Sequence, residues 1–184
     1  MYFEDYKVGQ VFDEEIESVS FTEEEIIEYA KKFDPRPIHI DKKAAEKSRF
    51  GRIIASGSFA NMAFWAQWVK TGIDADCVVA GVSVDEAKWI KPVYPDTIYN
   101  IKVETVAKKV RREGKDGFIS QKLMAYDPCG ELVLSYAVTA LVNFSGETQT
   151  NEWYWYLLSI VGIIILLRHN ASFNKNNHKE FIIC

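Results

Sequence analysis

Residues 29–39 read Tyr-Ala-Lys-Lys-Phe-Asp-Pro-Arg-Pro-Ile-His, and residues 53–57 continue this segment as Ile-Ile-Ala-Ser-Gly. The first stretch places an acid, Asp34, five residues before a base, His39, with two prolines between them. Each proline lacks a backbone N–H and biases the preceding residue toward an extended conformation. The sequence therefore predicts that a stiff loop, and not one face of a helix, presents the acid and the base. Catalytic residues are often found on such loops.

Neither residue is decisive alone. An isolated aspartate is commonly a polar loop residue, and an isolated histidine is commonly a partly buried side chain bonded to a backbone carbonyl. The two together at this spacing, with a proline on both sides of Arg36, favour a functional pair. A carboxylate accepts a hydrogen bond from water, and histidine readily exchanges protons near neutral pH. We therefore predict that Asp34 and His39 form a site for proton transfer.

A run of small residues, Ala55-Ser56-Gly57, precedes an apolar segment that is predicted to be helical. The first backbone N–H groups of a helix have no partner within it and can bind a carbonyl oxygen or an anion. Such donors are expected at Ser56 and Gly57. The alternative is that small residues only allow the helix to pack closely, which is at least as common.

Local signals predict the helices. Thr22 and Glu25 form a capping box, so a helix is expected from there to about Lys32, before Pro35 stops it. Residues 58–71 are apolar on nearly all sides, which predicts a buried central helix. A short helix is expected after Asp41.

Alternating apolar residues predict strands. The lead-in 2–19 is expected to contain the first strand. The segments 78–90, 97–112, 118–126 and 131–144 are expected to supply the others. The basic cluster Lys108, Lys109, Arg111 and Arg112 has two interpretations: solvated charges at a strand end, or a site for the phosphates of a ligand.

The central segment resembles a known family, the MaoC-like dehydratases and (R)-specific enoyl-CoA hydratases, whose motif is Asp-x-Asn-Pro-aliphatic-His. The residues that carry the resemblance are Asp34-Pro-Arg-Pro-Ile-His39, Asp41, Ala44-Ala45, Phe50-Gly51 and Ala55-Ser56-Gly57, and the match covers roughly residues 1–145. Two positions differ. Arg36 stands where the motif has Asn or Gln, and Pro95 runs directly into Asp96 where the family has an intervening glycine.

The resemblance implies an α+β hot dog fold, in which a curved antiparallel sheet wraps around a long central helix. It also implies reversible hydration of trans-2-enoyl thioesters, or dehydration of (R)-3-hydroxyacyl thioesters. The acyl group would be carried by coenzyme A or an acyl-carrier protein, and no cofactor would be needed. Asp34 and His39 would be catalytic and would orient and deprotonate the water. Arg36, Ser56 and Gly57 would bind substrate, with the thioester oxygen at the donors of Ser56 and Gly57. Family members commonly form homodimers or dimers of dimers, with two sheets joined edge to edge and acyl groups near the subunit interface.

Two other functions are compatible with the same fold. A hot dog thioesterase also uses a carboxylate and helix-start amides, although the Asp-to-His loop argues against it. A non-catalytic module that binds acyl thioesters is favoured if Arg36 disables the loop.

Composition excludes several other classes. The chain has 184 residues, enough for one domain with a sizeable core, and its net charge of −4 gives no broad basic surface for nucleic acid. The three cysteines are odd in number and widely spaced, which predicts a reducing compartment and no metal site. The acidic N-terminus lacks the apolar core of a signal peptide, so we expect a cytoplasmic protein.

The character of the sequence changes after the predicted domain, residues 1–145. The appended tail, residues 146–184, contains an apolar stretch at 153–167 followed by a polar end. As a helix this stretch would span about 22 Å, less than the ~30 Å hydrocarbon core of a bilayer. Three interpretations are open: a membrane-associated anchor or interfacial helix, a helix that covers the domain, or a non-native tail from a changed reading frame. Of these, we expect a segment that is poorly integrated into the domain or associated with a membrane.

Overall fold

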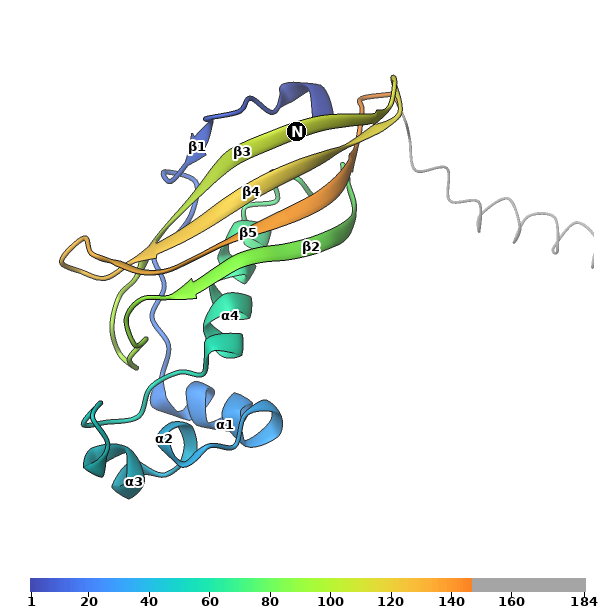
Figure 1. Cartoon of the computed structure of the whole chain (residues 1–184). Helices are drawn as coiled ribbons and strands as arrows, with labels where there is room; N and C mark the ends of the chain where they lie inside the picture. Colours follow the sequence, from blue (N-terminus) through green and yellow to red (C-terminus); the bar gives the residue numbers. More distant parts are fainter. Residues whose placement is uncertain (147–184) are drawn as a thin grey trace, which may run out of the picture. The chain divides into compact units, whose positions relative to one another are not determined.

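The structure is a computed structural model that describes residues 1–146. In this part of the chain a single antiparallel sheet of five strands accompanies four α-helices and one 3-10 turn (Figure 1). In chain order, the elements are η1 (Phe3–Asp5), β1 (Val11–Phe12), α1 (Glu23–Phe33), α2 (Pro37–Ile40), α3 (Lys42–Lys47), α4 (Gly57–Lys70), β2 (Val78–Trp89), β3 (Asn100–Arg112), β4 (Asp116–Tyr126) and β5 (Leu132–Asn143). The predicted tail, 146–184, and its apolar stretch, 153–167, lie outside the described residues apart from Gly146.

The sheet has the strand order β1-β3-β4-β5-β2 and bends around α4, as predicted (Figure 1). Phe64 and Trp68 of α4 are fully buried in the main core, together with sheet residues such as Val103, Leu123 and Leu134. Burying large apolar side chains stabilises a fold by roughly 1.5–3 kcal/mol each. The packing of α4 on the sheet therefore fixes where the first turn of this helix lies.

The capping box predicted for α1 is confirmed. The Thr22 hydroxyl accepts a hydrogen bond from the Glu25 N–H, and the Glu25 carboxylate accepts one from the Thr22 N–H. The helix ends at Phe33, with Asp34 as its C-cap. Pro35 follows, where its missing N–H would interrupt a longer helix. Asp34 is thus held at a defined helix end.

The prediction that the whole segment from Asp34 to His39 is non-helical is wrong in its second half. Residues 34–36 are outside any helix, but Pro37 begins the one-turn helix α2, which contains His39. A proline at the first helical position loses no hydrogen bond, and its fixed φ suits the helix. The short helix turns His39 back toward the end of α1.

Asp96 explains how the chain turns without the family's glycine. Its φ is 55°, in the left-handed region that glycine usually occupies and that Asp tolerates better than most residues. Its N–H donates to the carbonyl of Phe21 at 2.8 Å. Strand β3 then begins at Asn100, three residues later than expected.

The basic cluster on β3 makes structural contacts. Lys108 donates to the backbone carbonyls of Glu4 and Tyr6. Arg111 and Arg112 both pair with Asp116, and the Arg112 hydrogen bond holds the pKa of this buried carboxyl below its usual range. Three of the four charges thus lie at the strand end, as in the first interpretation, but they pair with protein groups and are not only solvated.

Two apolar surfaces remain exposed in the described chain. The central helix was expected to be buried all round, but Met62 and Val69 on α4 are 63% and 53% exposed. The strand β2 lies at an edge of the sheet, and it carries exposed Val79, Val82 and Val84. Between residues 1 and 146, no helix is both long and apolar enough to span a bilayer.

Gly117 on β4 provides a test of the packing. A Cβ there would lie 2.7 Å from the backbone carbonyl oxygen of Lys109 and against the Phe3 ring, and the backbone cannot move away easily. We expect Gly117→Ala to lower the free energy of unfolding by about 2 kcal/mol in urea titrations of the full chain. Gly81→Ala is the control, because nothing lies within 4 Å of its added Cβ. Equal stability of the two variants would contradict the described packing.

Candidate active site

A cavity of about 580 Å³ lies where the end of α1, the turn α2, the start of α4 and the segment after β2 meet. Its wall contains four of the five predicted site residues, Asp34, Arg36, His39 and Gly57. The other lining residues are Phe50, Ile54, Ala55, Ser58, Ala60, Asn61, Trp89, Ile90, Lys91, Pro92 and Val93. The structure therefore brings the acid, the base and the helix start to one cavity, although each comes from a different element.

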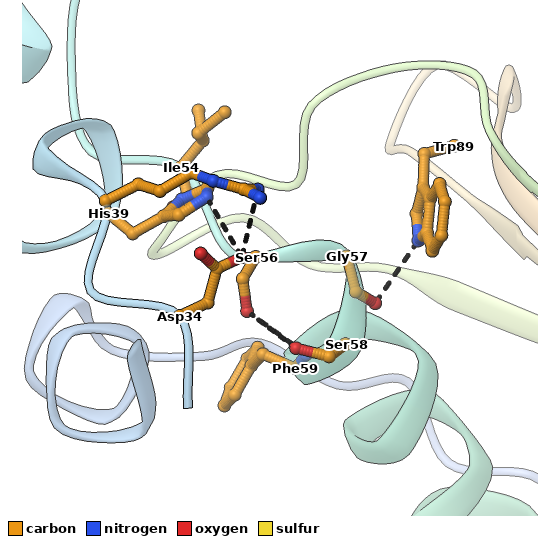
Figure 2. Close-up of polar contacts among 9 residues, drawn as sticks. Asp34, His39, Ile54, Ser56, Gly57, Ser58, Phe59 and Trp89 are labelled. Atoms are coloured by element: carbon orange, nitrogen blue, oxygen red, sulfur yellow. Dashed lines mark hydrogen bonds and ion pairs between the residues drawn. The ribbon is translucent and has the colours of Figure 1, made fainter. Parts of the chain in front are cut away.

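Asp34 and His39 face each other in this cavity (Figure 2). The Oδ2 atom of Asp34 lies 3.8 Å from Nε2 of His39. This distance is too long for a direct hydrogen bond. The imidazole is buried, with 6% of its side chain exposed, whereas the carboxylate is 20% exposed. The pair is thus open to a ligand on the side of the acid.

The backbone carbonyl of Ile54 determines which nitrogen of His39 carries a proton. Nδ1 of His39 lies 2.7 Å from this oxygen, which can only accept a hydrogen bond. Nδ1 must therefore donate, so in the neutral ring Nε2 carries the lone pair and faces Asp34. The Ile54 N–H in turn donates to the carbonyl of Ile38 at 3.4 Å, and the Ala55 N–H donates to Val93 at 2.8 Å. These backbone contacts hold the imidazole and the approach to α4 together.

Ser56 and Gly57 lie differently from each other at the start of α4. Ser56 is fully buried and is the N-cap: its hydroxyl accepts a hydrogen bond from the Phe59 N–H at 3.3 Å. Gly57 and Ser58 line the cavity, and within residues 1–146 neither of their backbone N–H groups has an acceptor. Ser56 shapes the helix start through its side chain, and the two residues after it supply the open donors.

Trp89 closes the cavity beside this helix start, a position that no local sequence signal indicates. Its indole Nε1 donates to the Gly57 carbonyl at 3.2 Å (Figure 2). The same nitrogen lies 3.2 Å from Oδ1 of Asn61, which also accepts from it. A Cβ on Gly57 would lie 2.6–2.9 Å from the indole ring, so only glycine fits at this contact. The glycine of the Ala-Ser-Gly step therefore allows an aromatic wall to lie directly on the backbone.

Two cations also reach the cavity. Nη1 of Arg36 lies 3.3 Å from Oδ2 of Asp34, and 72% of the arginine side chain is exposed. Lys91 pairs with both Asp127 and Glu131, which raise the pKa of its ammonium group, with the Glu131 hydrogen bond as the larger cause. Elsewhere in residues 1–146, no cluster of three or more His, Cys, Asp or Glu side chains is placed to hold a metal ion.

The arrangement has the parts needed for proton transfer beside a carbonyl group. The cavity combines a carboxylate, an imidazole nitrogen with a fixed lone pair, and a helix start whose N–H groups are open. Such donors stabilise negative charge on an oxygen when water is largely excluded. The site can therefore accept a proton at one end and stabilise an oxyanion at the other.

Comparison with known proteins agrees with this architecture. Residues 5–125 match the family described as MaoC like domain. The uncharacterized protein YdeM of Bacillus subtilis is 32% identical over 127 residues, which are 69% of this chain and 88% of that protein.

Two solved structures illustrate the fold. The monoamine oxidase regulatory protein from Archaeoglobus fulgius has a TM-score of 0.72 and 26% identity, covering 79% of this chain and 95% of its own. The (R)-hydratase from A. caviae involved in PHA biosynthesis has a TM-score of 0.58 and 18% identity, covering 74% and 96%, and shows the shared fold. The family match over residues 5–125 and the bent sheet around α4 lead to one conclusion: the chain belongs to the MaoC-like dehydratase family and has its hot dog fold.

Proposed function

We propose that this protein catalyses the reversible hydration of trans-2-enoyl thioesters to (R)-3-hydroxyacyl thioesters, with coenzyme A as the carrier. The observation that carries the proposal is the pair of Asp34 Oδ2 and His39 Nε2, which face each other across 3.8 Å in a cavity that also contains the start of α4. A gap of this size lets one water molecule contact both groups.

In the hydration direction, the oxygen of this water bonds to C3 of the enoyl group. Asp34 accepts a hydrogen bond from the water and orients it, and Nε2 of His39 accepts the proton that the water loses. The Ile54 carbonyl stabilises the imidazolium that forms, because it already accepts the Nδ1 proton. The proton returns to the substrate at C2, so that one water is added across the double bond. Dehydration is the reverse of these steps.

Negative charge develops on the thioester oxygen while the bond to C3 forms. The N–H groups of Gly57 and Ser58 are the donors placed to stabilise it, at the start of a helix whose dipole also favours an anion. Removing one such donor commonly lowers a rate by about 10²- to 10³-fold.

The same parts weigh against the two alternatives. A thioesterase directs water to the carbonyl carbon, and the Asp-to-His loop, which carries the resemblance to hydratases, argues against that activity. A non-catalytic module has no need for a histidine whose tautomer is fixed by a backbone carbonyl and whose lone pair faces a carboxylate. The family match supports a hydratase or dehydratase.

We further propose that the protein forms a homodimer through the outer edge of β2. This edge has no neighbouring strand in the described chain, and exposed Val82 and Val84 lie on it. Unpaired edges with apolar side chains readily pair with another strand.

The first prediction from the proposed function concerns the reaction. Purified protein should remove the enoyl absorbance of crotonyl-CoA without releasing a free thiol, because water adds to C3 and the thioester stays intact. Thiol release would instead indicate a thioesterase. Binding with neither change would indicate a non-catalytic module.

The second prediction concerns the two catalytic groups. Asp34→Asn and His39→Gln should each lower kcat by at least about a hundredfold. The first variant removes the carboxylate that orients the water, and the second removes the nitrogen that accepts its proton. Thermal unfolding should show that both variants remain folded. Asp76→Asn, an exposed acid away from the cavity, is the matched control and should retain full activity. Wild-type kinetics in either site variant would remove the assignment.

The third prediction concerns the helix start. Gly57→Ala should lower kcat/KM about tenfold or more, because the added methyl group displaces the Trp89 indole. The double variant Gly57→Ala with Trp89→Ala should recover part of this loss, since the methyl group then has room. Unchanged kinetics in Gly57→Ala would mean that the thioester does not bind at this helix start.

The fourth prediction concerns the oligomer. Analytical ultracentrifugation of the full chain should give twice the monomer mass, and Val84→Lys should shift the distribution toward the monomer by placing a charge on the paired edge. A monomeric wild-type protein would exclude the dimer.

A further inference from the structure

Arg36 brings a cation with unused hydrogen-bond donors into the cavity. Within the described chain, the one hydrogen bond of its side chain is the contact from Nη1 to Oδ2 of Asp34, at 3.3 Å. A guanidinium has five N–H donors, so most of them have no protein acceptor here. One long contact holds an exposed side chain only weakly. The guanidinium is therefore free to bind a second anion.

The other cation that lines the cavity, Lys91, already has protein partners for its charge. Lys91 pairs with Asp127 and Glu131, and these two carboxylates satisfy its charge. Among the charged groups that line the cavity, Arg36 is thus the cation that a ligand can use. Its planar fork can hold a carboxylate with two parallel hydrogen bonds, which a lysine cannot do.

The position of Arg36 indicates which part of the substrate carries this anion. The guanidinium contacts the same Oδ2 atom of Asp34 that faces Nε2 of His39. The guanidinium therefore lies next to the carboxylate that, in the proposed mechanism, orients the water at C3. The phosphates of coenzyme A are separated from the thioester by the whole pantetheine arm. An anion bound to Arg36 therefore belongs to the acyl group, close to C3.

We propose that Arg36 forms a subsite for a carboxylate on the acyl group, so that the preferred substrates are short dicarboxylic monothioesters such as a four-carbon trans-2-enedioyl thioester. This inference rests on the proposed function for the place of C3. The guanidinium also offsets the repulsion between Asp34 and a second carboxylate, which the neutral Asn or Gln of the family motif would not do.

The test measures binding, so that it does not depend on turnover. Butyryl-CoA and succinyl-CoA are saturated four-carbon thioesters that differ by one carboxylate and cannot be hydrated. Calorimetric titration of the full chain should show succinyl-CoA binding about tenfold more tightly than butyryl-CoA. In Arg36→Gln this ratio should fall to about one, and Arg36→Lys should retain part of it. Lys43→Gln, which removes an exposed cation outside the cavity, should leave the ratio unchanged.

Two outcomes would overturn the proposal. Equal weakening of both ligands in Arg36→Gln would mean that the guanidinium contacts the coenzyme A part. A wild-type protein without preference for succinyl-CoA would mean that there is no carboxylate subsite.

Hydration assays separate this proposal from the proposed function. Crotonyl-CoA and its 4-carboxylate analogue, fumaryl-CoA, serve as the two substrates. If neither is hydrated but the binding ratio and its loss in Arg36→Gln are observed, the hydratase assignment fails and the subsite stands. If crotonyl-CoA is hydrated but no binding preference exists, the hydratase assignment stands and the carboxylate subsite fails.

Discussion

The site depends on one hydrogen bond, from Nδ1 of His39 to the carbonyl of Ile54. This contact fixes the tautomer of the imidazole and so directs the lone pair of Nε2 toward Asp34. It also joins the helix turn α2 to the segment that leads into α4. The hydrogen bond from the Ile54 N–H to the carbonyl of Ile38 joins the same two segments, but only the contact to His39 also orients the base. The hydrogen bond therefore couples the group that accepts a proton to the donors that stabilise an oxyanion.

Much of this could be predicted from the sequence, because the signals are local. Thr22 and Glu25 are three residues apart, and the capping box that they form defines where α1 begins. The motif from Asp34 to His39 places the acid and the base within reach of each other through a single proline-rich segment. What local signals cannot supply is contact between distant segments. Trp89 lies 32 residues after Gly57, and only the path of β2 across the sheet brings its indole onto this glycine.

The differences from the predictions have physical reasons. Pro37 was expected to keep His39 out of a helix, but a proline at the first position of a helix obstructs nothing, because the obstruction applies to the preceding turn. Ser56 and Gly57 were expected to act together, yet a residue in the N-cap position turns its side chain toward the helix, and Ser56 is buried as a result. In both cases the residue type was informative, and its position relative to the helix boundary decided its role.

The edge strand β2 connects the site to the surface of the domain. Trp89 is its last residue, and the pairing of β2 with β5 shifts register between Asp85 and Lys88, where Glu86 has a φ of 52°. Such irregularities bend a strand and redirect the side chains that follow. The direction of the Trp89 indole is thus set by a strand that, among residues 1–146, pairs on one side only. Any strand that pairs with the free side of β2 restrains this bend, and through Trp89 it restrains the wall of the cavity beside Gly57.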